Sequence, residues 1–171
     1  MKKILIGVVV LGLIGVGSAW WRGQQCTSDP APQAAVQAYL QAMKDKRFSD
    51  AFDFVTARMT DGKARADWAA LQEKMFEMGG VSIGELDVRP AQRQRVNAFE
   101  CAASAKVPNV LHAADVLNNQ GSTEFEVYTL VLVEGRWRVD EQESLYGEKA
   151  IRPWFPTDDI PALKDTLPTE P

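Results

Sequence analysis

Few side chains in this sequence have the chemistry of a metal site or a covalent catalyst. His112 is the only histidine, and Cys26 and Cys101 are the only cysteines. A structural zinc site needs about four suitably spaced cysteine and histidine ligands, so we expect no metal and no cofactor. His112 could act alone as a general base, but a position at a strand surface or core edge is favoured for an isolated histidine.

Motifs of the common enzyme classes are also missing. The sequence contains no glycine-rich phosphate loop, no serine nucleophile elbow and no paired-carboxylate motif. Their absence argues against a hydrolase or a kinase. We therefore assign no catalytic residue and favour a protein that is not an enzyme, while the question of catalysis stays open.

The N-terminal segment, residues 1–22, predicts export from the cytoplasm. Two lysines precede an uncharged run at residues 4–21, and an arginine follows it. The run can be an uncleaved membrane anchor with its two tryptophans at the far interface, or a signal peptide cleaved near Ala19. We therefore expect an inner-membrane, single-pass protein with its domain in the periplasm, or a secreted or periplasmic protein after cleavage.

The charge of the chain excludes one class of partner. The net charge is −4, and setting aside the three basic residues of residues 1–22 leaves −7. An acidic domain repels phosphate backbones, so we expect no nucleic-acid partner. In an oxidising compartment Cys26 and Cys101 could form a disulfide, whereas a free cysteine at Cys101 on an apolar strand face is the favoured alternative.

Three amphipathic helices are predicted after a polar linker at residues 23–31. The first spans residues 34–46, the second is short, and the third runs from about 64 to 78 before Gly79-Gly80. Their apolar stripes, at helical spacing, are Ala35, Val36, Tyr39, Leu40 and Met43; Phe48, Ala51, Phe52 and Val55; and Trp68, Leu71 and Met75 with Phe76 or Met78.

The pattern then changes to the period of two that is typical of strands. A bulge is expected at Gly84, and Pro108 is expected to separate the second strand from the third. Residues 89–95 and 118–121 have the composition of turns. The predicted strands span residues 81–88, 96–107 and 110–117.

A β-hairpin at residues 122–143 follows, with its tight turn at Glu134-Gly135. Both faces of its first strand are apolar around Leu130, so we expect packing on both faces of the sheet. Prolines recur from residue 153 onward and exclude a regular element there. Trp154 and Phe155 are too apolar to stay in water, so we expect them to dock on the domain.

Two segments of the sequence resemble the nuclear transport factor 2-like superfamily: PQAAVQAYLQAMKDKRFSDAFDFV and the closing hairpin LVLVEGRWRVDE. The resemblance covers roughly residues 32–144. It implies an α+β fold with three N-terminal helices packed on a curved antiparallel sheet, the cone of that superfamily, preceded by one transmembrane or signal helix. The predicted parts are the segment 1–22, the linker 23–31, the domain 32–150 and a proline-rich tail, 151–171.

The resemblance also implies a pocket between the helices and the concave face of the sheet. Members of the isomerase type use a tyrosine and acidic side chains there, and an inward tyrosine bonded to a carboxylate would indicate ligand binding. A pocket filled by Phe52, Trp68 and Met75 would instead indicate a binding module for proteins. The pocket candidates are Tyr39, Phe52, Trp68, Tyr128 and His112, and the carboxylates near predicted core elements are Asp53, Asp87, Glu100 and Asp115.

We expect a non-catalytic module for protein binding or self-association in the bacterial cell envelope, anchored in the membrane by its N-terminal helix. Its partner would be an envelope protein or a second copy, as in a homodimer. An apolar patch on the exposed sheet face is the candidate interface, unless the tail covers it: Tyr128, Leu130, Leu132 and Trp154. The alternative is a small domain that binds an apolar ligand or acts like an isomerase, using the cone pocket.

Overall fold

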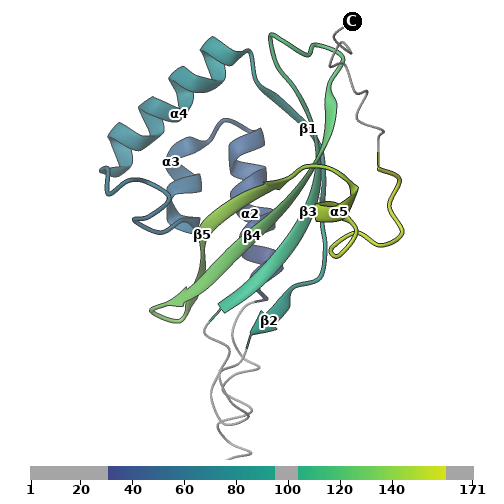
Figure 1. The fold of residues 1–171 in the computed structure, drawn as a ribbon. Coiled ribbons are helices and arrows are strands. Elements are labelled where there is room, and N and C mark those ends of the chain that lie inside the picture. Colours follow the sequence, from purple (N-terminus) through teal and green to yellow (C-terminus); the bar gives the residue numbers. More distant parts are fainter. Residues whose placement is uncertain (1–30, 95–103, 161–171) are drawn as a thin grey trace, which may run out of the picture.

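A computed structural model describes residues 31–94 and 104–160, which form an α+β domain (Figure 1). The predicted anchor at residues 1–22, Cys26, Glu100 and Cys101 lie outside the described residues. Within the described ranges, no helix is both long enough and apolar enough to cross a membrane.

Helices precede the strands, in the order that the sequence predicts. The helical elements are α2 (Pro32–Lys44), α3 (Phe48–Ala51), the 3-10 turn η1 (Phe52–Phe54), α4 (Arg65–Gly79) and the single turn α5 (Glu148–Ile151). The strands are β1 (Ser82–Val88), β2 (Gln92–Gln94), β3 (Ser104–Ala114), β4 (Ser122–Val133) and β5 (Arg136–Leu145).

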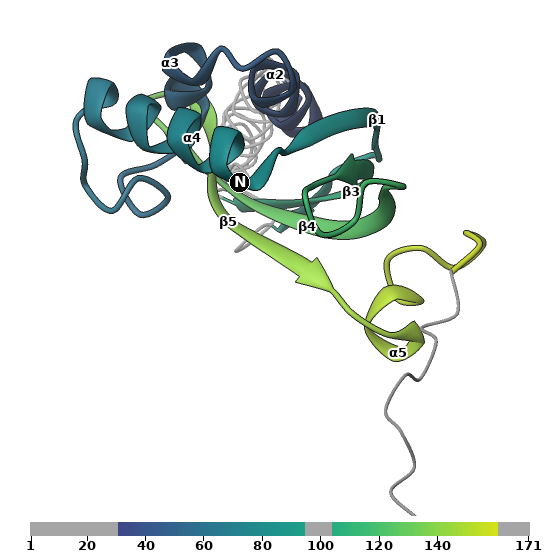
Figure 2. The same ribbon diagram turned by 90° about the horizontal axis from the view of Figure 1, so that it is seen from above.

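The strands form one antiparallel sheet in the order β1-β3-β4-β5, and β2 also pairs with β3. Figures 1 and 2 show α2, α3 and α4 on one face of this curved sheet and α5 on the other. The predicted hairpin is confirmed, because β4 and β5 pair from Phe125–Leu145 up to Val133–Arg136. Glu134 and Gly135 both have positive φ angles, as a two-residue hairpin turn of the primed type requires.

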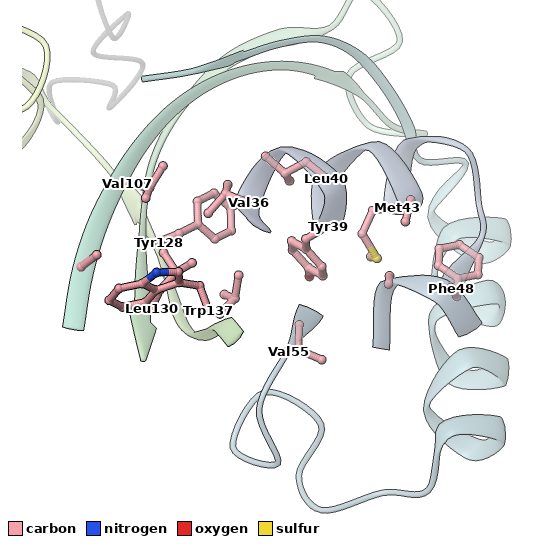
Figure 3. Packing of buried hydrophobic residues seen from close by; sticks show 14 of the residues in the cluster. Val36, Tyr39, Leu40, Met43, Phe48, Val55, Val107, Tyr128, Leu130 and Trp137 are labelled. Carbon is pink, nitrogen blue, oxygen red and sulfur yellow. The ribbon is translucent and has the colours of Figure 1, made fainter. Parts of the chain in front are cut away.

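The main core lies between α2 and the concave face of the sheet. Pro32 occupies the first turn of α2, where its fixed φ suits a helix start and no backbone donor is lost. Side chains of α2 meet sheet side chains in one buried cluster that Figure 3 shows in part. The labelled members from α2 and the sheet are Val36, Tyr39, Leu40, Met43, Val107, Tyr128, Leu130 and Trp137.

A second, smaller core covers the opposite face of the sheet. Phe125 and Val127 of β4 pack there with Ile151 and Phe155, and the Phe125 and Phe155 rings meet edge to face at 5.0 Å. An ion pair of 2.6 Å between Arg89 and Asp158 also holds this segment. The predicted docking of Phe155 and the predicted packing on both faces of β4 are therefore confirmed.

Helix α4 is less buried than its sequence predicts. Trp68 is buried, but Leu71, Met75 and Met78 are 39%, 51% and 68% exposed. The prediction that Leu71 and Met75 fill the core is therefore wrong, and of the alternatives Phe76 and Met78 it is Phe76 that packs against the core. The first turns of α4 pack against the α3 region, and the views in Figures 1 and 2 show the rest of the helix at the edge of the domain.

Pro108 does not interrupt the sheet, contrary to the sequence prediction. Strand β3 runs through it without a break, from Ser104 to Ala114. The Pro108 carbonyl accepts a hydrogen bond from Arg89 N, so the missing donor faces the same edge. There β1 ends at Val88 and β2 begins at Gln92, so the missing N–H of Pro108 falls at the junction between the two neighbouring strands.

Two bulges shape the sheet around the concave face. The predicted bulge at Gly84 is confirmed, because the register of β1 shifts between Ile83 and Leu86. A second shift, which the sequence did not predict, places Asp140 of β5 as an extra residue between Val139 and Glu141. Thr56 donates a 2.7 Å hydrogen bond to Asp140 and fixes this bulge.

Candidate functional site

A cavity of about 300 Å³ lies between the helices and the concave face of the sheet. Its wall is mostly apolar and aromatic, and its lining residues include two amides, Gln72 and Gln142, and two tyrosines, Tyr39 and Tyr128. A volume of about 300–1,000 Å³ with few polar groups is typical of a small-molecule pocket. The lining residues are Tyr39, Leu40, Met43, Met59, Trp68, Gln72, Phe76, Ile83, Leu111, Tyr128 and Gln142.

A buried carboxylate lies directly behind this wall. Glu126 is only 1% exposed. The Tyr128 hydroxyl donates to Glu126 Oε2 over 2.7 Å, and Gln142 Nε2 donates to Oε1 over 2.6 Å. Asn109 Nδ2 donates to Oε2 over 3.2 Å. We name these four side chains the Glu126 cluster.

The sheet register brings the Glu126 cluster together. Glu126 and Tyr128 are two residues apart on β4, so both side chains point to the concave face. Asn109 of β3 pairs directly with Glu126. On β5 the bulge at Asp140 reverses the alternation, so that Gln142 pairs with Tyr128 and reaches the pocket.

Burial dominates the electrostatics of the site. It raises the pKa of Glu126, while the hydrogen bonds from Tyr128, Asn109 and Gln142 act in the opposite direction. Burial, and then the nearby Glu126, raise the pKa of Tyr39 to about 12. The same two causes raise the pKa of Tyr128 well above its ordinary value. Both tyrosines are therefore neutral hydroxyl groups at physiological pH.

The Glu126 cluster contains no cation. Among the described residues, Glu126 forms no ion pair with a lysine, an arginine or a histidine. Its three donors are all neutral groups. Asn109 Oδ1, also buried, has no hydrogen-bond partner within the described residues. The cluster is therefore rich in acceptors and carries no positive charge.

Three of the five predicted pocket residues line the cavity: Tyr39, Trp68 and Tyr128. Phe52 lies behind the wall, where its ring meets Trp68 edge to face at 5.8 Å. His112 does not line the cavity. It follows Leu111 on β3, so alternation turns it to the opposite face, where it is exposed.

The carboxylates that the sequence singled out lie elsewhere. Asp53 is exposed and pairs with Arg65, whose hydrogen bond lowers the pKa of Asp53. Asp87 is exposed and pairs with Arg89. Asp115 accepts from two backbone N–H groups in the turn after β3. None of these three lines the cavity, and no cluster of metal-ligating side chains occurs within residues 31–94 and 104–160.

The predicted interface patch does not form as expected. Tyr128 and Leu130 are fully buried under the helices, because their face of β4 is the concave one. Leu132 is half-buried at the edge of the same core. Trp154 is half-buried on the other side of the sheet, beside Lys106. The four residues therefore do not share one exposed surface.

Glu126 is the site residue that the sequence prediction missed. It lies in the hairpin at the same parity as Tyr128 and Leu130, two residues that the pattern places on one face. The sequence did contain a signal for Glu126: it is a carboxylate between apolar neighbours, at a position whose side chain points inward. Gln142 had no such signal, because simple alternation from Val139 would turn Glu141 inward instead.

Comparisons with solved structures show the α+β fold. A SEC-C motif-containing protein from Rhodopseudomonas palustris is similar at 15% identity and a TM-score of 0.51, over 68% of this chain and 80% of that one. A Nostoc punctiforme domain of unknown function with a cystatin-like fold gives 15% identity and a TM-score of 0.47, over 72% and 79%. The intermembrane-space region of the chloroplast protein ARC6 gives 13% and 0.43, over 67% and 94%. No family model and no curated protein matches the sequence.

Proposed function

We propose that this domain binds a small, largely apolar molecule in the pocket between its helices and the concave face of its sheet. The observation that carries the proposal is the inward Tyr128 hydroxyl, bonded to the buried Glu126 carboxylate behind an open cavity. Met75 does not fill that cavity, because its side chain is half exposed on α4. An inward tyrosine bonded to a carboxylate was the expected sign of ligand binding, so these two observations favour a ligand-binding domain.

Binding without catalysis fits the Glu126 cluster better than proton transfer does. A general base must lie within hydrogen-bond reach of its substrate. Both oxygens of Glu126 already accept hydrogen bonds, and a ligand reaches Oε1 only by displacing the Gln142 amide, which a weakly acidic substrate proton would not do. The cluster thus supplies a polar wall that can orient a ligand.

Calorimetric titration with phenethyl alcohol tests this proposal. Gln72 lines the cavity from α4, whereas Lys74 is exposed on the same helix. Gln72→Trp fills the cavity, and Lys74→Trp adds the same ring to solvent. Binding to the wild type and to Lys74→Trp, with loss in Gln72→Trp, supports the pocket. Equal affinity in all three proteins would refute it.

Self-association is the second candidate function, and a different surface favours it. Leu71, Met75 and Met78 follow each other at spacings of four and three, so they share one face of α4. All three are exposed. A second copy of this chain could cover them. Sedimentation of the wild type and of Met75→Glu tests this: a dimer lost in the variant supports it, and a monomeric wild type rejects it.

For its placement in the cell we propose a periplasmic domain that follows a membrane anchor or a cleaved signal at residues 1–22. The support is the sequence pattern of that segment alone. We also infer that the fold is the nuclear transport factor 2-like cone, from the order of helices and strands and from the closing hairpin. Alkaline phosphatase fused after Pro171 tests the placement, because it is active only when exported.

A further inference from the structure

We propose that the pocket takes a small apolar molecule that carries an ammonium group, with Glu126 as its counter-charge. The inference rests on the proposed function and names the chemical class of the ligand. Three features of the site carry it: an uncompensated buried carboxylate, a surplus of acceptors, and access from a cavity lined by aromatic residues.

The first feature is the charge balance of the site. The cavity wall contains no charged side chain, and one carboxylate lies a single hydrogen bond behind it. Burying an ionised carboxylate among neutral donors is unfavourable unless a cation comes near. Within the described residues the protein supplies no such cation to Glu126. An ammonium group in the cavity would supply it.

The second feature is the surplus of acceptors. Asn109 Oδ1 is buried beside Glu126 and has no donor among the described residues. Glu124 lies two residues before Glu126 on the same face of β4 and is half-buried. An ammonium group offers three N–H donors and no acceptor, so it adds only donors to a site in which acceptors are in surplus. A carboxylate or phosphate ligand would add acceptors and would be repelled by Glu126.

The third feature is access from the cavity. Gln142 lines the cavity and is itself exposed, so its amide can rotate away from Glu126 Oε1. The ammonium group would then take the place of that amide on the same oxygen. Tyr39, Trp68 and Phe76 line the cavity beside it. Aromatic faces attract cations and also hold an apolar ligand body.

Three probes of nearly equal size and different head-group charge test this inference. Phenethylammonium, phenethyl alcohol and phenylacetate are titrated into the full chain in a zwitterionic detergent at neutral pH, with a detergent blank for each. We expect phenethylammonium to bind at least about tenfold more tightly than the other two, as a charge-assisted hydrogen bond predicts.

Glu126→Gln is the decisive variant, because its amide keeps the shape of the carboxylate and can exchange hydrogen bonds with Gln142. We expect it to remove the preference for phenethylammonium, so that phenethylammonium and phenethyl alcohol bind the variant with similar affinity. Glu143→Gln makes the same change of net charge on an exposed residue of the opposite face. It should keep the preference.

The possible failures of the two proposals are distinguishable. If phenethyl alcohol binds as tightly as phenethylammonium, or if Glu126→Gln keeps the preference, the ammonium inference is wrong and the pocket stands. If phenylacetate binds most tightly, the inference is wrong as well. If none of the three probes binds, both the ammonium inference and the proposed function fall.

Discussion

The Tyr128 hydroxyl donates a 2.7 Å hydrogen bond to Oε2 of Glu126, which lies two residues earlier on β4. Both side chains are buried on the concave face of the sheet, and Tyr128 also forms part of the pocket wall. A change at this hydrogen bond should therefore affect both the stability of the domain and the shape of its pocket.

Removing this hydroxyl should destabilise the domain. Tyr128→Phe keeps the ring and its edge-to-face contact with Tyr39, but leaves Glu126 with one donor fewer. We expect the free energy of unfolding to fall by about 1–3 kcal/mol in a urea titration. Tyr146 is 79% exposed, so Tyr146→Phe is the matched control and should change nothing. Equal effects in the two variants would contradict the importance of the bond.

The stability of the domain should depend on the ionisation of Glu126. Burial raises the pKa of Glu126 above 4.5, so the folded protein holds a proton that the unfolded chain has released above that pH. The protonated Glu126 side chain therefore contributes its full stabilisation below about pH 4.5. This stabilisation is lost as the pH rises through the pKa of Glu126 in the folded protein. The groups that face Glu126 are Tyr39 from α2 and Tyr128 and Glu124 from β4.

Urea titrations of the wild type and Glu126→Gln between pH 4 and pH 8 measure this contribution. The unfolding free energy of the wild type relative to the variant should decrease as the pH rises. Glu143→Gln, a change of an exposed carboxylate on the opposite face of the sheet, should retain the pH dependence of the wild type. A difference that increases with pH would mean that the carboxylate is stabilised in its ionised form.

The segment after β5 should contribute strongly to stability. Phe155 is 1% exposed and packs on Phe125, on the sheet face opposite α2, α3 and α4. We expect Phe155→Ala to lower the unfolding free energy by about 3–5 kcal/mol. Leu117 is 94% exposed, so Leu117→Ala is a control that should be neutral. A neutral Phe155→Ala would show that this second core does not form in solution.

Two turn glycines should differ in their tolerance of alanine. Gly121 and Gly135 both have positive φ, which costs an alanine about 1–2 kcal/mol. A Cβ atom at Gly121 would also lie 3.2 Å from the Ala113 carbonyl oxygen and 2.6 Å from His112 Nε2, whereas one at Gly135 meets nothing within 4 Å. Thermal unfolding should therefore show a larger loss for Gly121→Ala than for Gly135→Ala. The opposite order would contradict the packing of His112 against this turn.

The sequence predicted the elements of this fold better than its pocket. Periodicity found α2, α3 and α4 and both strands of the hairpin within a few residues, because each element has a buried stripe. It failed at Pro108, because a proline can stay in a strand at a junction where one neighbouring strand ends and the next begins. It also failed for Leu71 and Met75, because apolar spacing does not reveal whether a partner covers the face.

The Glu126 cluster shows why a site is harder to predict than a strand. Tyr128 was predicted as a pocket residue, and Glu126 shares its parity and could have been predicted with it. Asn109 joins them only through the register between β3 and β4, which no local pattern records. Gln142 joins them only through the bulge at Asp140, which depends on a hydrogen bond from the distant Thr56.

Methionine methyl NMR of the full chain during titration with phenethyl alcohol tests the central claim most directly. Met43 and Met59 line the cavity, whereas Met75 and Met78 are exposed on α4 and serve as internal controls. Ligand binding in the pocket predicts saturable shifts at Met43 and Met59 with unchanged signals from Met75 and Met78. Shifts confined to Met75 and Met78, or no shift at all, would contradict it.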